Sequence, residues 1–231
     1  MLKYNFKLVN NCNVVTFSCL LLALSLAFMS FENKLANNDD KTKIAKEVKL
    51  TFKVNVADNV DLPEGFADTL KKAEEILSKI LSSEDFKQAL SKRSFADSAF
   101  SKTKKTCFER IYDENGRVSG LGVYENITRN PNVEIEWVIK KYKDGQKTSV
   151  MGYSTFCVNK ITSHDYWIKN GQYLSLRFVR HLAHEYTHVC GYKHDKLLPK
   201  EHKFKKGDDP AMGVGGIVGD IMLDWTKRGL L

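Results

Sequence analysis

Hydrophobic and polar residues alternate strictly from Val48 to Val56, which predicts a half-buried β-strand. The segment Asp61 to Glu64 is typical of a helix start, and the apolar residues after it recur with helical spacing. These residues are Phe66, Leu70, Ala73, Ile76, Leu77, Ile80 and Leu81. We therefore expect a long amphipathic helix after the first strand, and a shorter helix from Ser83 to about Leu90.

The segment from Thr106 to Ile161 predicts several antiparallel strands. Asn115-Gly116 and Asp144-Gly145 are turn signals, and an alternating run lies between them. The apolar positions of this run are Val133, Ile135, Trp137 and Ile139. Val150 to Val158 is expected to be the last strand before a second major helix, and the C-terminal part is expected to be irregular. This order favours an α+β domain with a mixed, mostly antiparallel twisted sheet.

The N-terminal residues have the layout of an export signal. Lys3 and Lys7 precede an apolar run from Val14 to Met29, and small residues at Ser25 and Ala27 suit a cleavage site. We expect residues 1–27 to be a signal peptide, residues 28–45 a polar linker and residues 46–231 the functional domain. An uncleaved membrane anchor is the alternative for the first segment. Either interpretation predicts an exported protein that is secreted or held in the cell envelope.

The chain has a formal net charge of +8, which suits nucleic acid, anionic membranes or acidic substrates as partners. Its basic residues are interspersed with acidic residues along the whole sequence. This pattern favours a solvated surface, and no specific binding of nucleic acid is expected. Membrane association is expected only if the N-terminal segment is not cleaved.

Three cysteines remain once Cys12 and Cys19 are assigned to the export segment. Cys107, Cys157 and Cys190 allow one internal disulfide and one spare thiol in an oxidising compartment. Three buried thiols are an equally good alternative, and the sequence does not choose the pair.

The candidate chemistry lies on the helix that begins near Leu174. His184 and His188 are four residues apart, so both imidazoles lie on one helix face and can bind a single metal ion. Glu185 lies beside them and can accept a proton without being a ligand. Zinc with an open coordination position lowers the pKa of water to about 7, which makes peptide-bond hydrolysis the fitting reaction.

The residues after this helix extend the pattern. Gly191 can adopt the left-handed conformation that ends a helix and reverses the chain, so that His194 returns to the same metal as a third ligand. An acidic residue such as Glu201 is the alternative third ligand. Cys190 is expected to point away from the metal. His181 is expected to face solvent or to lie beside the metal site without binding the metal, and His164 and His202 are assigned no role.

The complete motif, H-E-x-x-H-x-x-G-x-x-H-D over residues 184–195, resembles that of the metzincin clan of zinc endopeptidases, and most closely its adamalysin (reprolysin) branch. The resemblance implies a zincin-like fold with an active-site helix and one catalytic Zn²⁺ held by His184, His188 and His194. It also implies Glu185 as the general base and a structural role for Asp195. The strand near Val150 to Phe156 would border the cleft and pair with an extended substrate.

The same resemblance implies a methionine-containing turn beneath the metal. Met212 is the better candidate and Met222 the alternative, and no tyrosine follows Met212 as in several branches of the clan.

These patterns together predict an exported zinc metalloendopeptidase that acts as a monomer on a protein or peptide substrate. The first alternative is a catalytically weak, zinc-stabilised binding or toxin-like module. The second is a basic envelope protein that binds anionic polymers. The first alternative depends on metal, whereas the second predicts binding that depends steeply on salt and not on metal.

Overall fold

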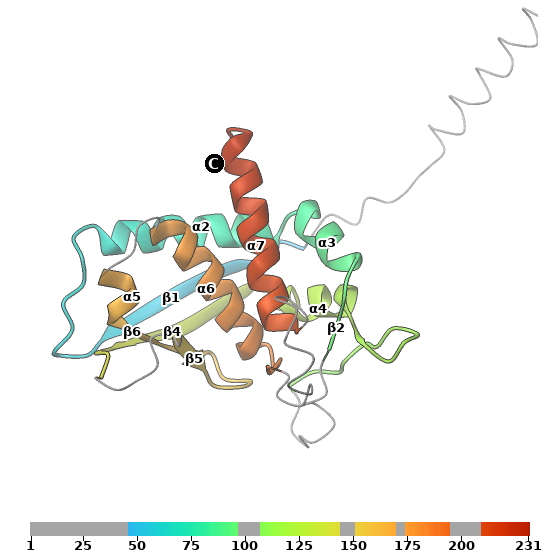
Figure 1. Ribbon diagram of the computed structural model, residues 1–231, viewed down its shortest axis with the longest axis horizontal. Coiled ribbons are helices and arrows are strands. Elements are labelled where there is room, and N and C mark those ends of the chain that lie inside the picture. The colour runs from blue at the N-terminus through green and yellow to red at the C-terminus, as the bar shows by residue number, and fades with distance from the viewer. Residues whose placement is uncertain (1–45, 97–106, 144–150, 170–173, 195–208) are drawn as a thin grey trace, which may run out of the picture. The chain divides into compact units, whose positions relative to one another are not determined.

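The predicted first strand forms as β1, Lys49–Val56, at one edge of a four-stranded sheet (Figure 1). The computed structural model describes residues 46–96, 107–143, 151–169, 174–194 and 209–231. The signal peptide and linker predicted for residues 1–45 lie outside this part of the chain. The alternation in the sequence is reproduced in β1, where Leu50 and Phe52 are buried and Lys49 and Lys53 are exposed.

The sheet has the order β1-β4-β6-β5. The other strands are β4 (Asn132–Lys140), β5 (Gly152–Ser154) and β6 (Lys160–His164). β1 pairs with β4 and β4 with β6 in parallel, and β5 alone pairs antiparallel, with β6. The prediction of a mostly antiparallel sheet is therefore wrong. The connection from β1 to β4 contains three helices, which gives the long crossover that a parallel pair requires.

The segment from Thr106 to Ile161 also departs from the prediction. Gly116 does occupy a turn with a positive φ, but this turn lies beside a small pair of strands, β2 (Ser94–Phe95) and β3 (Val118–Ser119). Helix α4, Gly120–Ile127, follows directly where strands were expected. The expected strand from Val150 to Val158 is reduced to β5. Cys157 has a left-handed backbone that ends the extended segment, and β6 is the last strand before the helices.

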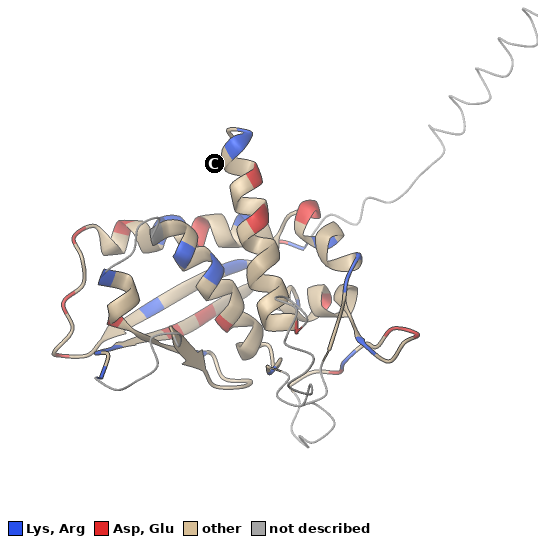
Figure 2. Cartoon of the chain, in the orientation of Figure 1, with Lys and Arg blue, Asp and Glu red and all other residues tan. Residues whose placement is uncertain are grey.

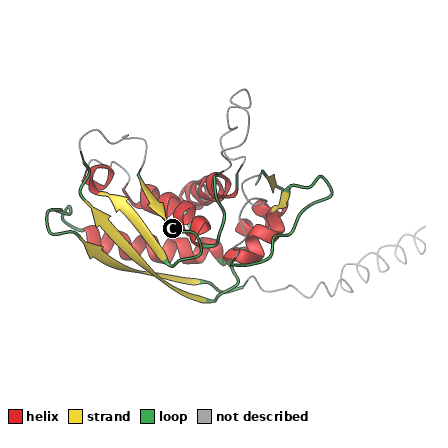
Figure 3. Cartoon of the chain, turned by 90° about the horizontal axis from the view of Figure 1, so that it is seen from below, coloured by secondary structure: helices red, strands yellow, loops and turns green. Residues whose placement is uncertain are grey.

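Helices cover one face of the sheet (Figure 3). The predicted amphipathic helices are confirmed as α2, Phe66–Leu81, and α3, Glu84–Ser91. Side chains of α2 also accept outward backbone N–H groups of the edge strand β1: Ser78 from Leu50 and Glu74 from Phe52. Ser82, the C-cap of α2, accepts in the same way from Val48, which directly precedes β1. This edge is therefore protected from pairing with another chain.

An aromatic cluster joins the sheet to the helices. Trp137 of β4 is completely buried, and its ring centroid lies 5.9 Å from that of Phe66 on α2 and 5.5 Å from that of Phe178. Phe178 belongs to α6, Leu174–Val189, and also meets Trp167 of α5, Asp165–Lys169, at 5.6 Å. These two contacts of Phe178 are edge-to-face and fix α6 against the sheet, while the rings of Phe66 and Trp137 are tilted.

The C-terminal part, expected to be irregular, contains helix α7, Pro210–Lys227, which packs on α6. Its glycines are poor helix formers, but they allow the two helices to approach closely. A Cβ atom at Gly215 would lie 3.2 Å from the carbonyl oxygen of Arg180 and from Cβ of His184. Tertiary packing therefore overrides local propensity here.

Charges of both signs are spread over the described elements (Figure 2), as the sequence indicates. Among the described residues, the structure has no helix whose length and apolar character would suit a membrane span.

The sequence did not choose which cysteines pair. In the structure a disulfide joins Cys107 to Cys157, and Cys190 is a free thiol. Burial raises the pKa of the Cys190 thiol to about 12. The bridge closes a loop of 50 residues.

Removal of this bridge should destabilise the domain. We expect the double variant Cys107→Ser/Cys157→Ser to lower the free energy of unfolding by about 2–4 kcal/mol, because the unfolded chain regains the entropy of the open loop. Urea unfolding followed by tryptophan fluorescence measures this change. Cys190→Ser is the control and should cost about 1 kcal/mol or less. An equal loss in both variants would contradict the expectation.

Candidate metal centre

Three histidines converge at the end of α6. His184 and His188 lie one turn apart on this helix, as predicted, and their ring centroids are 4.9 Å apart. The ring of His194 lies 5.0 Å from the first and 4.6 Å from the second. One nitrogen of each ring falls within 4.8 Å of the other two. The structure thus brings together all three predicted ligands.

The turn after α6 depends on Gly191. Its φ of 93° is a conformation that side-chain-bearing residues rarely adopt. A Cβ atom here would also lie 2.7 Å from Sγ of Cys107 and 2.7 Å from the ring of Phe108. Both constraints favour glycine. The reversal at this residue returns His194 to the face of His188, as the sequence predicts.

The outer nitrogens of the three rings are all occupied. Nδ1 of His184 bonds the carbonyl of Ala211 at 3.1 Å, and Nδ1 of His188 bonds the carbonyl of Tyr192 at 2.6 Å. Nδ1 of His194 bonds the carboxylate of Asp209 at 3.0 Å. Because all three partners are acceptors, each Nδ1 carries the proton and each Nε2 presents a lone pair.

This arrangement suits a bound cation. Burial lowers the pKa of His184 to about 3 and that of His188 to about 4, so both rings are neutral near pH 7. The Nε2 atoms of His188 and His194 are 3.2 Å apart. Nitrogens around tetrahedral zinc, at about 2.0–2.1 Å from the metal, are separated by about 3.4 Å. Three converging lone pairs are stabilised by a cation between them, so this group of residues could hold a metal ion.

Asp209 is the carboxylate that orients the third ligand. It is 1% exposed, and its second oxygen accepts the backbone N–H of Met212, which caps the start of α7. Burial favours the neutral acid, but the hydrogen bonds from His194 and Met212 lower the pKa of Asp209, which is therefore ionised. The sequence analysis missed this residue. Its one signal was an Asp before Pro210, which is typical of a helix cap.

Glu185 lies beside the histidines in a buried position, 3% exposed. The hydroxyl of Ser154 on β5 donates to its Oε2 at 2.6 Å and so fixes the carboxyl group. Burial raises the pKa of Glu185 to about 7, even though the bond from Ser154 lowers it. A carboxyl group with this pKa can exchange a proton near neutral pH. Nothing in the sequence marks Ser154 as its partner.

His181 lies near this carboxyl group but beyond hydrogen-bond distance from it. Its Nδ1 lies 3.8 Å from Oε1 of Glu185, and its Nε2 lies 2.9 Å from the hydroxyl of Ser163. Ser163 in turn accepts the indole N–H of Trp137. His181 is 7% exposed, so of the two expected positions it takes the one beside the site and not the one facing solvent.

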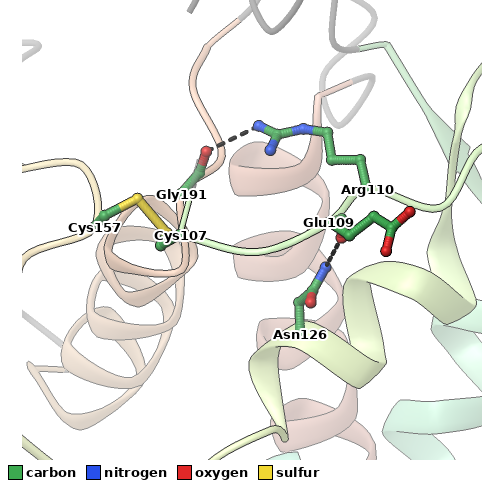
Figure 4. Close-up of a disulfide and its surroundings, with 6 residues drawn as sticks. All are labelled: Cys107, Glu109, Arg110, Asn126, Cys157 and Gly191. Carbon is green, nitrogen blue, oxygen red and sulfur yellow. Dashed lines mark hydrogen bonds between the residues drawn. A yellow bond between two sulfur atoms is a disulfide. The ribbon is translucent and has the colours of Figure 1, made fainter. Parts of the chain in front are cut away.

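A strap formed by residues 107–110 holds the turn at Gly191 (Figure 4). Arg110 donates to the carbonyl of Gly191 at 2.9 Å, and its guanidinium lies 4.7 Å from the ring centroid of Tyr192. Asn126 of α4 donates to the Tyr192 hydroxyl at 3.0 Å. The Cys107–Cys157 bridge anchors the start of the strap. The strap therefore supports the same backbone that accepts the hydrogen bond from His188.

An open cleft of about 440 Å³ gives access to the histidines. It is lined by Met151, Gly152, Arg177, Arg180, His181, His184, Glu185, His194, Met212, Gly215 and Gly216. The segment before and within β5 borders this cleft, as the resemblance implied. Met212 lines the cleft, but it belongs to the first helical turn of α7 and not to a separate methionine-containing turn. Met222 is buried further along the same helix. Asp195, Glu201 and His202 lie outside the described residues.

No model of a known protein family, no curated protein and no solved structure matches this chain.

The contact between Asp209 and His194 predicts a loss of metal affinity in Asp209→Asn. The amide keeps an oxygen to cap α7, but its NH₂ group cannot accept from His194, and we expect affinity to fall about 10–100-fold. Competition with a chromogenic chelator measures this affinity.

Asp224→Asn, an exposed change on the same helix, is the control and should leave affinity unchanged. Equal affinities of all three proteins would show that Asp209 does not orient the ligand.

Proposed function

We propose that this chain is an exported zinc-dependent endopeptidase in which Glu185 is the general base and His184, His188 and His194 hold the metal. One observation carries the proposal. Three imidazoles, each held by a hydrogen bond at Nδ1, converge beside the buried carboxyl group of Glu185 in an open cleft. Imidazole ligands suit zinc as well as several other transition metals, and zinc is a Lewis acid without redox chemistry of its own, which suits hydrolysis.

When bound, zinc acts as a Lewis acid that polarises a carbonyl group and activates water for attack near neutral pH. The residues of the chain supply the proton transfer. Glu185 accepts a proton at the oxygen that is not bonded to Ser154, and its pKa of about 7 allows it to return that proton to the leaving amine. Ser154 holds the carboxyl group in one orientation through its hydrogen bond to Oε2.

The edge strand β5 is the candidate support for the substrate. It is the last strand in the order β1-β4-β6-β5, and Gly152 of this strand lines the cleft. An extended peptide can add to such an edge through main-chain hydrogen bonds, which hold sequences of varied composition. This geometry favours cleavage within a chain, provided the peptide lies in an extended conformation.

Glu185→Gln tests the catalytic role against the alternative of a zinc-stabilised binding module. We expect cleavage of an unfolded protein to fall at least about 100-fold, because the amide cannot accept the proton, while zinc still binds with a stoichiometry of one. Electrophoresis of the digest and metal analysis measure the two quantities. Glu134→Gln, an exposed change on β4, is the control and should keep full activity.

The proposal of a peptidase fails if the zinc-loaded protein cleaves no unfolded substrate. It also fails if Glu185→Gln keeps its activity.

His194→Ala tests the third ligand. Loss of one of three imidazoles should weaken zinc binding by at least about 100-fold, so that dialysed protein retains less than one zinc per chain. Metal analysis after dialysis measures the zinc content. His164→Ala is the control, because this histidine lies at the end of β6 outside the cluster. Full zinc retention in His194→Ala would instead favour an acidic ligand such as Glu201.

A further inference from the structure

The cleft that leads to the histidines carries two positive side chains that the proposed chemistry does not use. Arg177 and Arg180 of α6 line it, and Glu185 is the one acidic residue among the lining residues. Even a fully ionised Glu185 offsets only one of the two guanidinium charges. The cleft is therefore electropositive independently of any metal.

Both arginines lie on the part of α6 that precedes the histidines. Arg180 is four residues before His184, and Arg177 is four residues before His181, so each lies one helical turn from a residue of the centre. One turn rises 5.4 Å along the helix axis. The guanidinium groups thus belong to the same cleft as the metal ligands but lie on its N-terminal side along α6.

Close packing against α7 holds Arg180. A Cβ atom at Gly219 would lie 2.5 Å from Cδ and 2.8 Å from Cγ and Nε of this arginine. The aliphatic part of the side chain therefore rests on the glycine surface of α7. This contact restricts the rotamers of Arg180 before any ligand binds, which reduces the entropy lost on binding.

Neither arginine has an ion pair with a carboxylate elsewhere in the described part of the chain. Arg228, by contrast, pairs with Asp224 at 3.0 Å on the exposed end of α7. A guanidinium is charged at all relevant pH values, and its planar set of donors matches a carboxylate in bidentate geometry. Two such groups side by side in one cleft favour a carboxylate ligand.

We propose that Arg177 and Arg180 form a subsite for a carboxylate of the substrate, so that the peptides bound here carry an acidic group close to the bond that is cleaved. This inference rests on the proposed peptidase function. An extended peptide rises about 3.3 Å per residue, so a carboxylate one to two helical turns from the metal ligands lies within about three residues of that bond. The carboxylate comes from an Asp or Glu side chain or from the C-terminus of the substrate.

Binding to the full chain measures this subsite separately from catalysis. Zinc-loaded Glu185→Gln is titrated with fluorescent, C-terminally amidated peptides in which a single Glu is moved through each position, and each is compared with its Gln counterpart. We expect the Glu peptide to bind about tenfold more tightly at one position, because a charge-assisted bidentate contact is replaced by a neutral one. The same peptides, as internally quenched substrates of the wild-type protein, should show a similar ratio of kcat/KM.

Three variants assign the preference to the arginines. Arg177→Gln and Arg180→Gln should each reduce the Glu/Gln ratio towards one. Gly219→Ala keeps all charges but displaces the stem of Arg180, and should also reduce the ratio. Arg228→Gln is the matched control and should leave the ratio unchanged, since this arginine lies outside the cleft.

The outcomes separate the two proposals. A peptide that binds with the arginine-dependent preference but is not cleaved supports the subsite and contradicts the peptidase function. Cleavage of Glu and Gln peptides at equal rates, with equal binding at every position, overturns the subsite and leaves the peptidase. A preference limited to peptides with a free C-terminus, and lost on amidation, identifies the terminal carboxylate as the source. Absence of peptide binding at any position overturns the subsite.

Discussion

The candidate centre depends on the hydrogen bonds that hold the outer nitrogens of three histidines. The acceptors are Ala211, Tyr192 and Asp209, each bonded to Nδ1 of one ring. Without them the three rings would rotate freely. These bonds fix both the tautomer and the orientation of each ring, so that the lone pairs point to one place. Burial keeps His184 and His188 neutral and hence able to bind a cation.

The three acceptors come from two segments that the rest of the fold positions. The start of α7 provides Ala211 and Asp209, and it reaches His184 because Gly215 allows the helices to approach. The turn after α6 provides Tyr192, and the strap at residues 107–110, anchored by the disulfide, supports it. The same close contact between α6 and α7 rests the stem of Arg180 on Gly219. The candidate metal centre and the proposed substrate preference therefore share one helix–helix interface.

The sheet contributes to the site through its edge. Ser154 of β5 fixes Glu185, while Ser163 of β6 contacts His181 and accepts from Trp137 in the core. Ser154 thus fixes the carboxyl group directly, while Ser163 holds the neighbouring imidazole of His181 against the buried core. A group with a raised pKa needs such support, because a mobile carboxyl would turn towards water and regain its ordinary acidity.

The sequence by itself determined the elements that local spacing encodes: β1, α2, α3, helix α6, and a glycine turn that returns His194 to His184 and His188. These features follow from periodicity and from φ preference, which act over a few residues. Only the tertiary structure decided the parallel pairing of β1, β4 and β6, the pairing of Cys107 with Cys157, the helical form of the glycine-rich C-terminal segment and the role of Asp209. Each of these depends on contacts between residues distant in the chain, whose energies outweigh local propensity and leave no periodic pattern in the sequence.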